Sequence, residues 1–290
     1  EKLYPLFPAL VAEPVPKKLI DSIPAAVKAR KQEADRLRRK DVWDEKSVRE
    51  WSEVAAEARD RKETIHFGRV FGIMVVKNSE LPVDDERRKY KYRLVFQGDR
   101  AVDQSWGTAL FKDLGSAPAS MDAGKAADAI GNFPGYTVMQ ADAEQAYVQA
   151  ELQGRKTWVM LPEEIWPDSW YFDEARTKPR YYRPVVRLVK ALYGHPDAGT
   201  FWEMHCDACL KRSGFESVES WPSCYVHRRL NLFLSVYVDD FKLAGPKESM
   251  DDGWALIQKF VTMEKPTDAC LYLGCEHKER TVKLSDGREV

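Results

Sequence analysis

Two patterns of apolar and polar positions divide the chain near residue 64. Residues 25–63 place apolar side chains at helical spacing among many Ala, Arg, Lys and Glu residues, which predicts one or two amphipathic helices. From Phe67 the period changes: Val70–Val76 is rich in β-branched residues and Tyr90–Phe96 alternates, which predicts an antiparallel pair of strands. We expect the helices to pack one stripe on the main domain rather than to form an interaction arm.

The pattern after residue 100 interleaves helices with strands. Helices are expected over 120–131, 143–152, 198–212 and 247–261, and strands over 137–141, 230–238, 241–244 and 271–273. This mixture predicts an α+β fold. The predicted domains are a charged N-terminal helical extension or linker over 1–64 and a main domain over 65–290.

Composition excludes several classes of protein. The 45 basic and 46 acidic side chains leave a formal charge of −1, which argues against a uniformly basic coat for nucleic acid but leaves room for local basic surfaces. No apolar run approaches the roughly 18–20 residues of a membrane helix. Five cysteines favour a reducing compartment, and Cys206 and Cys209 are expected to share a helix face rather than a zinc ion.

Three carboxylates stand at predicted strand ends. Asp239 and Asp240 follow an apolar strand, and Asp142 ends a separate one. Taken alone, an Asp-Asp pair at a hairpin is most simply turn chemistry. Carboxylates from two strand ends could instead share Mg²⁺ ions for two-metal phosphoryl transfer. Nucleases and polymerases both use that chemistry, so the acids alone do not choose between them.

Five segments carry a resemblance to a known family. Tyr237–Asp240 resembles the polymerase signature of reverse transcriptases, and the other segments resemble those of copia-type LTR retrotransposon polyproteins in order and spacing. They are Lys91–Val95 (K-A-R-L-V in the family), Gln140–Tyr147 (Q-M-D-V-K-T-A-F), Arg187–Gly194 (R-L-K-K-A-L-Y-G) and Leu271–Glu276 (Y-F-L-G-I-E). The resemblance covers about residues 65–280, and its strength lies in five motifs in the right order.

The resemblance implies the fingers and palm of a right-hand polymerase, with an antiparallel palm sheet backed by helices and an N-terminal helical extension. It implies an RNA-directed DNA polymerase that transfers a nucleotide from dNTP to a primer 3′-hydroxyl. Little of a thumb and no ribonuclease H domain are expected within 65–290. The expected partners are an RNA or DNA template with its primer, dNTP and other segments of a Pol polyprotein, with no membrane. The expected location is a cytoplasmic particle whose product reaches the nucleus.

The resemblance also assigns roles to residues. Asp142 and Asp239 are expected to bridge two Mg²⁺ ions, with Mn²⁺ as an alternative, and Asp240 to be a more peripheral catalytic and metal-binding carboxylate. The residues assigned to the substrate are Tyr147, Arg93, Lys91, Ala143 and Tyr237. Tyr147 is expected to lie under the incoming sugar and exclude a 2′-hydroxyl, against the alternative that it only packs on the palm. Arg93 and Lys91 are expected to hold triphosphate oxygens, although a solvated cationic strand face is nearly as good an account of Lys91.

One segment departs from the family. His195–Trp202 stands where copia elements usually read L-K-Q-A-P-R-A-W, a segment expected to line the nascent base pair, so its nucleotide contacts stay open. Leu271–Glu276 is expected to hold the primer end, against the alternative of a plain structural strand. Two other functions remain. A decayed or repurposed remnant would bind nucleic acid without polymerising, and a metal-dependent nuclease would explain the acids but not Tyr147.

Overall fold

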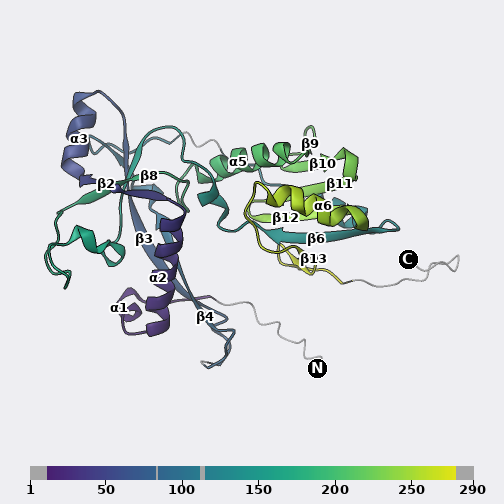
Figure 1. Cartoon of the computed structure of the whole chain (residues 1–290), viewed down its shortest axis with the longest axis horizontal. Coiled ribbons are helices and arrows are strands. Elements are labelled where there is room, and N and C mark those ends of the chain that lie inside the picture. The colour runs from purple at the N-terminus through teal and green to yellow at the C-terminus, as the bar shows by residue number, and fades with distance from the viewer. Residues whose placement is uncertain (1–11, 83, 112–114, 279–290) are drawn as a thin grey trace, which may run out of the picture. The chain divides into compact units, whose positions relative to one another are not determined.

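The chain forms two compact units, each a mixture of helices and strands (Figure 1). The computed structural model describes residues 12–82, 84–111 and 115–278. Unit 1 comprises the chain up to Asp113 and Ala150–Phe201, and unit 2 comprises Leu114–Gln149 and the chain from Trp202. The prediction of an α+β fold is confirmed. Residues 1–11 and 279–290 of the two predicted domains lie outside the described residues.

Unit 1 is built around one mixed sheet. Its central strands run in the order β1-β3-β7-β8-β2, and β4 and β5 also pair with β3. The β3–β7 pair is parallel, whereas the other pairs are antiparallel. The elements are β1 (Glu13–Pro14), α1 (Lys17–Ile20), α2 (Pro24–Arg39), β2 (Trp43–Glu50), α3 (Trp51–Asp60), β3 (His66–Lys77), β4 (Lys89–Phe96), β5 (Val102–Asp103), β7 (Thr157–Met160) and β8 (Pro184–Leu188), with 3₁₀ helices η1 (Gly98–Arg100), η3 (Glu163–Ile165) and η4 (Asp168–Trp170).

The N-terminal region differs from the expected run of helices. α2 and α3 lie within the predicted range, but β2 interrupts it and pairs with β8, with Trp43 opposite Leu188 and Glu50 opposite Pro184. Helical spacing and strand alternation are hard to separate in a segment where charged residues outnumber apolar ones. The region therefore contributes a strand to the sheet of unit 1 as well as a helix, α2, that packs on β4.

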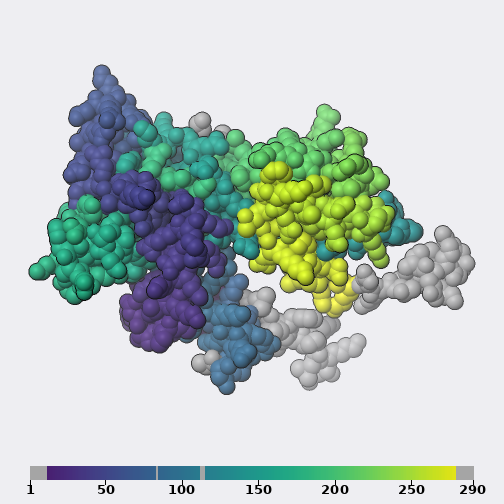
Figure 2. Space-filling model, in the orientation of Figure 1, coloured from purple at the N-terminus to yellow at the C-terminus, as the bar shows by residue number. Residues whose placement is uncertain are grey.

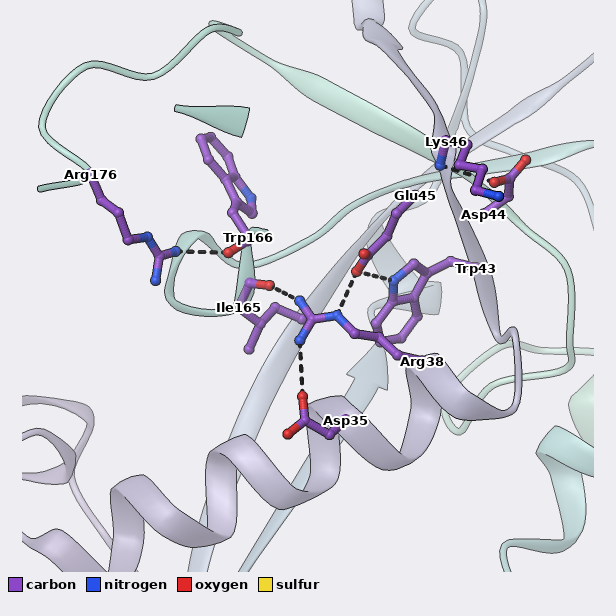
Figure 3. Close-up of polar contacts among 9 residues, drawn as sticks. All are labelled: Asp35, Arg38, Trp43, Asp44, Glu45, Lys46, Ile165, Trp166 and Arg176. Atoms are coloured by element: carbon purple, nitrogen blue, oxygen red, sulfur yellow. Dashed lines mark hydrogen bonds and ion pairs between the residues drawn. The ribbon is translucent and has the colours of Figure 1, made fainter. Parts of the chain in front are cut away.

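Arg38 fastens the end of α2 to the rest of unit 1 (Figure 3). Its Nε donates to Glu45 Oε1 at 2.7 Å, and its Nη2 donates to the carbonyl of Ile165. Trp43 Nε1 donates to the same Glu45 oxygen at 3.1 Å. In the space-filling view, the purple and blue surface of residues 12–60 adjoins the green surface of the segment between β7 and β8 (Figure 2). The N-terminal region is thus an integral part of unit 1.

Gly194 ends the segment Arg187–Gly194 at a place where only glycine fits. Its φ is +83°, and a Cβ there would lie 2.2 Å from the carbonyl oxygen of Phe96. The neighbouring Tyr193 carbonyl accepts the Phe96 N–H at 2.7 Å. A left-handed glycine therefore lets this segment lie directly against the end of β4.

Unit 2 is an antiparallel sheet between two layers of helix. Its strands run in the order β13-β6-β12-β11-β10-β9, and β14 and β15 form a separate hairpin. α4 packs on one face through its alanines, and α5 and α6 cover the other face, where α5 buries Cys206 and Cys209 (Figure 1). The elements are α4 (Met121–Gly131), β6 (Tyr136–Asp142), η2 (Ala146–Gln149), α5 (Ala198–Arg212), β9 (Glu216–Ser217), β10 (Cys224–His227), η5 (Arg228–Leu230), β11 (Leu232–Tyr237), β12 (Asp240–Pro246), α6 (Lys247–Gln258), β13 (Thr267–Asp268), β14 (Leu271–Tyr272) and β15 (Cys275–Glu276).

Most predicted elements of unit 2 are confirmed, and one is wrong. The helix expected over 143–152 is absent: among its residues, only Ala146–Gln149 forms a 3₁₀ turn. The Ala143 and Glu144 N–H groups donate to the carbonyls of Asp239 and Thr262, so tertiary contacts take the backbone groups a helix would use. Within the described part of the chain, no helix is long and apolar enough to cross a membrane.

Candidate active site

Strand pairing in unit 2 brings the three predicted acids to one end of the sheet. β6 ends at Asp142 and β12 begins at Asp240, and the antiparallel register places these two residues directly opposite each other. Asp239 lies in the two-residue loop between β11 and β12, where Tyr237 pairs with Asp240. Directly opposed residues have Cβ atoms about 4.5–5.5 Å apart, so their carboxylates act on one another.

The loop that carries Asp239 is strained and fixed from both sides. Val238 has a φ of 57°, a left-handed conformation that β-branched residues rarely adopt and that tight hairpins usually give to glycine. Its carbonyl accepts the indole N–H of Trp202 at 2.7 Å. The Asp239 carbonyl accepts the Ala143 N–H, also at 2.7 Å. These two hydrogen bonds hold the turn in a conformation that its own sequence disfavours.

The segment after Asp142 is held against residues 262–264. The Asp142 carbonyl accepts the Glu264 N–H at 2.8 Å. The Gln149 side chain donates to the Thr262 carbonyl at 2.8 Å and accepts the Thr262 N–H at 2.9 Å. Strand pairing with β12 therefore holds Asp142 on one side. Hydrogen bonds between its own segment and residues 262–264 hold it on the other.

The acids differ in burial and in charge. Asp142 and Asp239 are exposed, whereas Asp240 is half-buried. Burial, followed by the charges of Asp142 and Asp239 and a hydrogen bond with Asp142, raises the pKa of Asp240 to about 7. The Asp240 carboxyl is thus partly protonated at neutral pH.

This crowding of carboxylates suits a divalent cation. Mg²⁺ is usually held by one or two protein carboxylates, with substrate phosphates and water completing its shell. Within residues 12–82, 84–111 and 115–278, no group of three or more His, Cys, Asp or Glu side chains converges as a metal site by itself. The pair of opposed acids with the exposed Asp239 beside it fits an ion that takes the rest of its ligands from a substrate.

The structure brings three of the predicted substrate residues to the same end of unit 2. Tyr147 lies on η2 and packs half-buried on the main core, and burial together with the charge of Asp239 raises the pKa of its hydroxyl. Tyr237 is exposed at the end of β11, next to the loop. Ala143 is buried, so its contribution is the backbone N–H that holds the Asp239 carbonyl.

Lys91 and Arg93 belong to unit 1. Both lie on β4, opposite Val75 and Ile73 of β3. Burial, then the charge of Arg93, lowers the pKa of Lys91. The Arg93 guanidinium lies 5.1 Å from the ring centroid of Tyr193, and its charge also acts on the buried Glu33 of α2. Within the described residues, neither of these two cations forms a salt bridge with a carboxylate.

The segment that departs from the family turns several side chains inward. His195, Asp197 and Phe201 are all buried in unit 1. The rings of Phe96 and Phe111 each have their centroid 5.0 Å from that of His195. Burial lowers the pKa of His195 to about 4, so the ring is neutral at pH 7. These three side chains pack the interior of unit 1.

A buried ionic group next to the acids is not apparent from the family motifs. Lys242, two residues after Asp240, is 1% exposed. Its Nζ lies 2.6 Å from Asp128 Oδ1 on α4, 3.0 Å from His277 Nε2 and 4.7 Å from the ring centroid of Tyr272. In the sequence, the signal is Lys242 itself, the one charged residue of the predicted strand 241–244. In the structure, the group connects the β14–β15 hairpin to β12, the strand that carries Asp240.

The raised pKa of Asp240 predicts a pH-dependent effect of Asp240→Asn. The folded state disfavours the ionised Asp240 carboxylate. The resulting loss of unfolding free energy in wild type is absent below about pH 4, grows toward pH 7 and is complete above it. With EDTA present, the variant should gain about 1–2 kcal/mol of unfolding free energy over wild type at pH 8, after allowance for solvent screening, and much less at pH 5. Urea unfolding measures this, with Asp251→Asn on α6 as the control. A difference independent of pH would contradict the assigned environment.

The Lys242 group predicts coupling between β12 and α4. Lys242→Met leaves Asp128 without its buried partner and should lower the free energy of unfolding by about 2 kcal/mol or more. Lys125→Met, an exposed change on the same α4, should alter it by less than about 0.5 kcal/mol. In a double-mutant cycle with Asp128→Asn, the second change should cost much less once the first is present. Strictly additive losses in urea unfolding would show that the two residues do not act as a pair.

One comparison with known proteins identifies the family of this chain. The family model described as reverse transcriptase (RNA-dependent DNA polymerase) matches residues 73–285, which is more than half of the chain and includes Asp142, Asp239 and Asp240. No curated protein matches the chain. The chain belongs to the reverse transcriptase (RNA-dependent DNA polymerase) family.

Proposed function

We propose that this chain is the RNA-directed DNA polymerase of a copia-like retrotransposon and contains its fingers and palm. The observation that carries the proposal is the register of β6 and β12, which opposes Asp142 and Asp240 within the matched residues 73–285. The reaction is transfer of a nucleotide from dNTP to the 3′-hydroxyl of a primer on an RNA or DNA template, with release of pyrophosphate.

The three acids divide the work by their environments. Asp142 and Asp239 are exposed and would hold two Mg²⁺ ions, or Mn²⁺ in their place. When bound, the ions lower the pKa of the primer hydroxyl and neutralise charge on the leaving pyrophosphate. Asp240 is half-buried and holds its proton to about pH 7, which suits a peripheral carboxylate that supports Asp142.

Other residues would position the substrates. Tyr147 would lie under the incoming sugar and exclude a 2′-hydroxyl. Burial and the charge of Asp239 raise the pKa of its hydroxyl. Arg93 would grip triphosphate oxygens with two N–H groups, and Lys91 would act as a point charge. Leu271–Glu276, the β14–β15 hairpin, would hold the primer end, and its anchor is the Gln140 side chain, which donates to the Leu271 carbonyl at 2.9 Å.

A second candidate is a retroelement remnant that binds nucleic acid without polymerising. The observation that favours it is the burial of His195 and Asp197 at positions where the family's segment is expected to line the nascent base pair. Loss of those contacts would remove positioning, and phosphoryl transfer depends mostly on positioning and charge. Primer extension separates the two candidates.

Primer extension on poly(rA)/oligo(dT) with Mg²⁺ and dTTP tests the proposal. Wild type should extend the primer, and Asp239→Asn should lower the rate by about 100-fold or more, because it removes a group that stabilises transition-state charge. The matched control Asp251→Asn changes an exposed acid on α6 and should extend like wild type. If neither wild type nor Asp239→Asn extends while both bind the duplex with similar, salt-sensitive affinity, the remnant is the correct account.

A further inference from the structure

The β14–β15 hairpin of unit 2 is closed by a tight turn and buries a single side chain. Tyr272 pairs with Cys275, and the two residues between them, Leu273 and Gly274, have φ values of 49° and 79°. Two successive left-handed residues form the two-residue turn whose twist matches that of the paired strands. Among Leu271–Glu276, only Tyr272 is buried, at 6% exposed. The position of the hairpin on unit 2 therefore depends largely on what surrounds this ring.

The Tyr272 ring contacts both β12 and α4. The Lys242 Nζ of β12 lies 4.7 Å from the ring centroid. On α4, a Cβ added to Gly124 would come 3.4 Å from Tyr272 Cε1, so the helix approaches the ring closely. Burial, helped by the charges of Asp240 and Asp128, raises the pKa of the hydroxyl to about 12, so it is neutral at pH 7. A ring beside a desolvated ammonium is held more strongly than by apolar packing alone.

Lys242 connects this ring to the strand that carries Asp240. The two residues are two positions apart on β12, so their side chains point to the same face of the sheet. The Lys242 Nζ lies 2.6 Å from Asp128 Oδ1 and 3.0 Å from Nε2 of His277, one residue after β15. The same His277 nitrogen lies 3.2 Å from Asp128 Oδ2. Because a buried charge is costly to separate from its partner, the ammonium has one stable location.

We propose that Lys242 is a positioning residue for the primer 3′-end: it holds the hairpin, and with it the primer, at a fixed place relative to Asp240. This role rests on the proposed function, in which the hairpin holds the primer end. Lys242 is 1% exposed, so it cannot touch the substrate and acts through Tyr272. Placement matters for phosphoryl transfer, since an error of about 1 Å can cost about 100-fold in rate.

A merely structural role for Lys242 would have a different signature. If Lys242 only stabilised unit 2, its loss would lower the folded fraction and the apparent kcat, and the folded molecules would bind the primer end as before. If Lys242 positions the hairpin, its loss changes the surroundings of the primer end in the folded molecules too. The KM for primer–template then rises, whereas the KM for dNTP changes little.

A primer with 2-aminopurine at its 3′-end, annealed to an RNA template, tests the role without catalysis. The full chain carries Asp239→Asn and is assayed in EDTA without dNTP, so failure of polymerisation does not affect the result. Lys242→Met should return the emission of the bound primer toward that of the free duplex and weaken duplex binding by about tenfold. Lys125→Met, an exposed change on α4, should behave like the parent.

Tyr272→Leu guards against loss of folding, because it leaves the Lys242–Asp128 ion pair intact. It should change emission and affinity as Lys242→Met does. In the Tyr272→Leu background, Lys242→Met should have little further effect, since it acts through the ring that is already gone. With the acids intact, Lys242→Met should raise the KM for primer–template about tenfold and that for dTTP by less than about twofold.

Two results would overturn the role of Lys242. One is that Tyr272→Leu and Lys242→Met, both folded by circular dichroism, give the emission and affinity of the parent. The other is that the parent binds no duplex or leaves the emission of the primer end unchanged. If wild type fails to extend a primer while both variants shift the emission, the polymerase activity is wrong and the positioning of a bound primer end by Lys242 stands.

Discussion

The antiparallel pairing of β6 with β12 is the constraint on which the site depends. Because side chains alternate along a strand, a shift of one residue would move Asp142 away from Asp240 to the opposite face. The same register places Gln140 opposite Lys242. Both side chains contact the β14–β15 hairpin, Gln140 at the Leu271 carbonyl and Lys242 at the Tyr272 ring. One pairing therefore fixes both the acids and the segment proposed to hold the primer end.

The opposed acids carry an energetic cost that the fold offsets locally. Like charges and partial burial disfavour ionised Asp240, and Val238 is held in a left-handed turn. Hydrogen bonds from Trp202 and Ala143 fasten that turn, while the buried Lys242 and Asp128 secure β12 to α4. Strain and charge concentrated at one end of a well-packed sheet are typical of a functional site.

The two units differ in how much of their structure could be predicted from the sequence. The strands that end in Asp142 and begin at Asp240 could be predicted, because apolar alternation is strong and the motifs fix the acids. β2 could not, because its eight residues are mostly polar and pairing with β8 decides their conformation. The segment after Asp142 has helical composition but forms only η2, since its backbone bonds to Thr262. The stack of Trp51 on Trp106 joins residues 55 positions apart and is visible only in the structure.

Metal binding tests the central claim most directly, because it needs neither template nor turnover. Titration with Mn²⁺, followed by electron paramagnetic resonance of the free ion, should show binding to wild type that Asp142→Asn weakens about tenfold or more. Asp251→Asn, which removes an exposed acid elsewhere in unit 2, should bind Mn²⁺ like wild type. Equal binding by wild type and Asp142→Asn would contradict the account, since the opposed acids at the end of β6 and β12 would then not be the metal site.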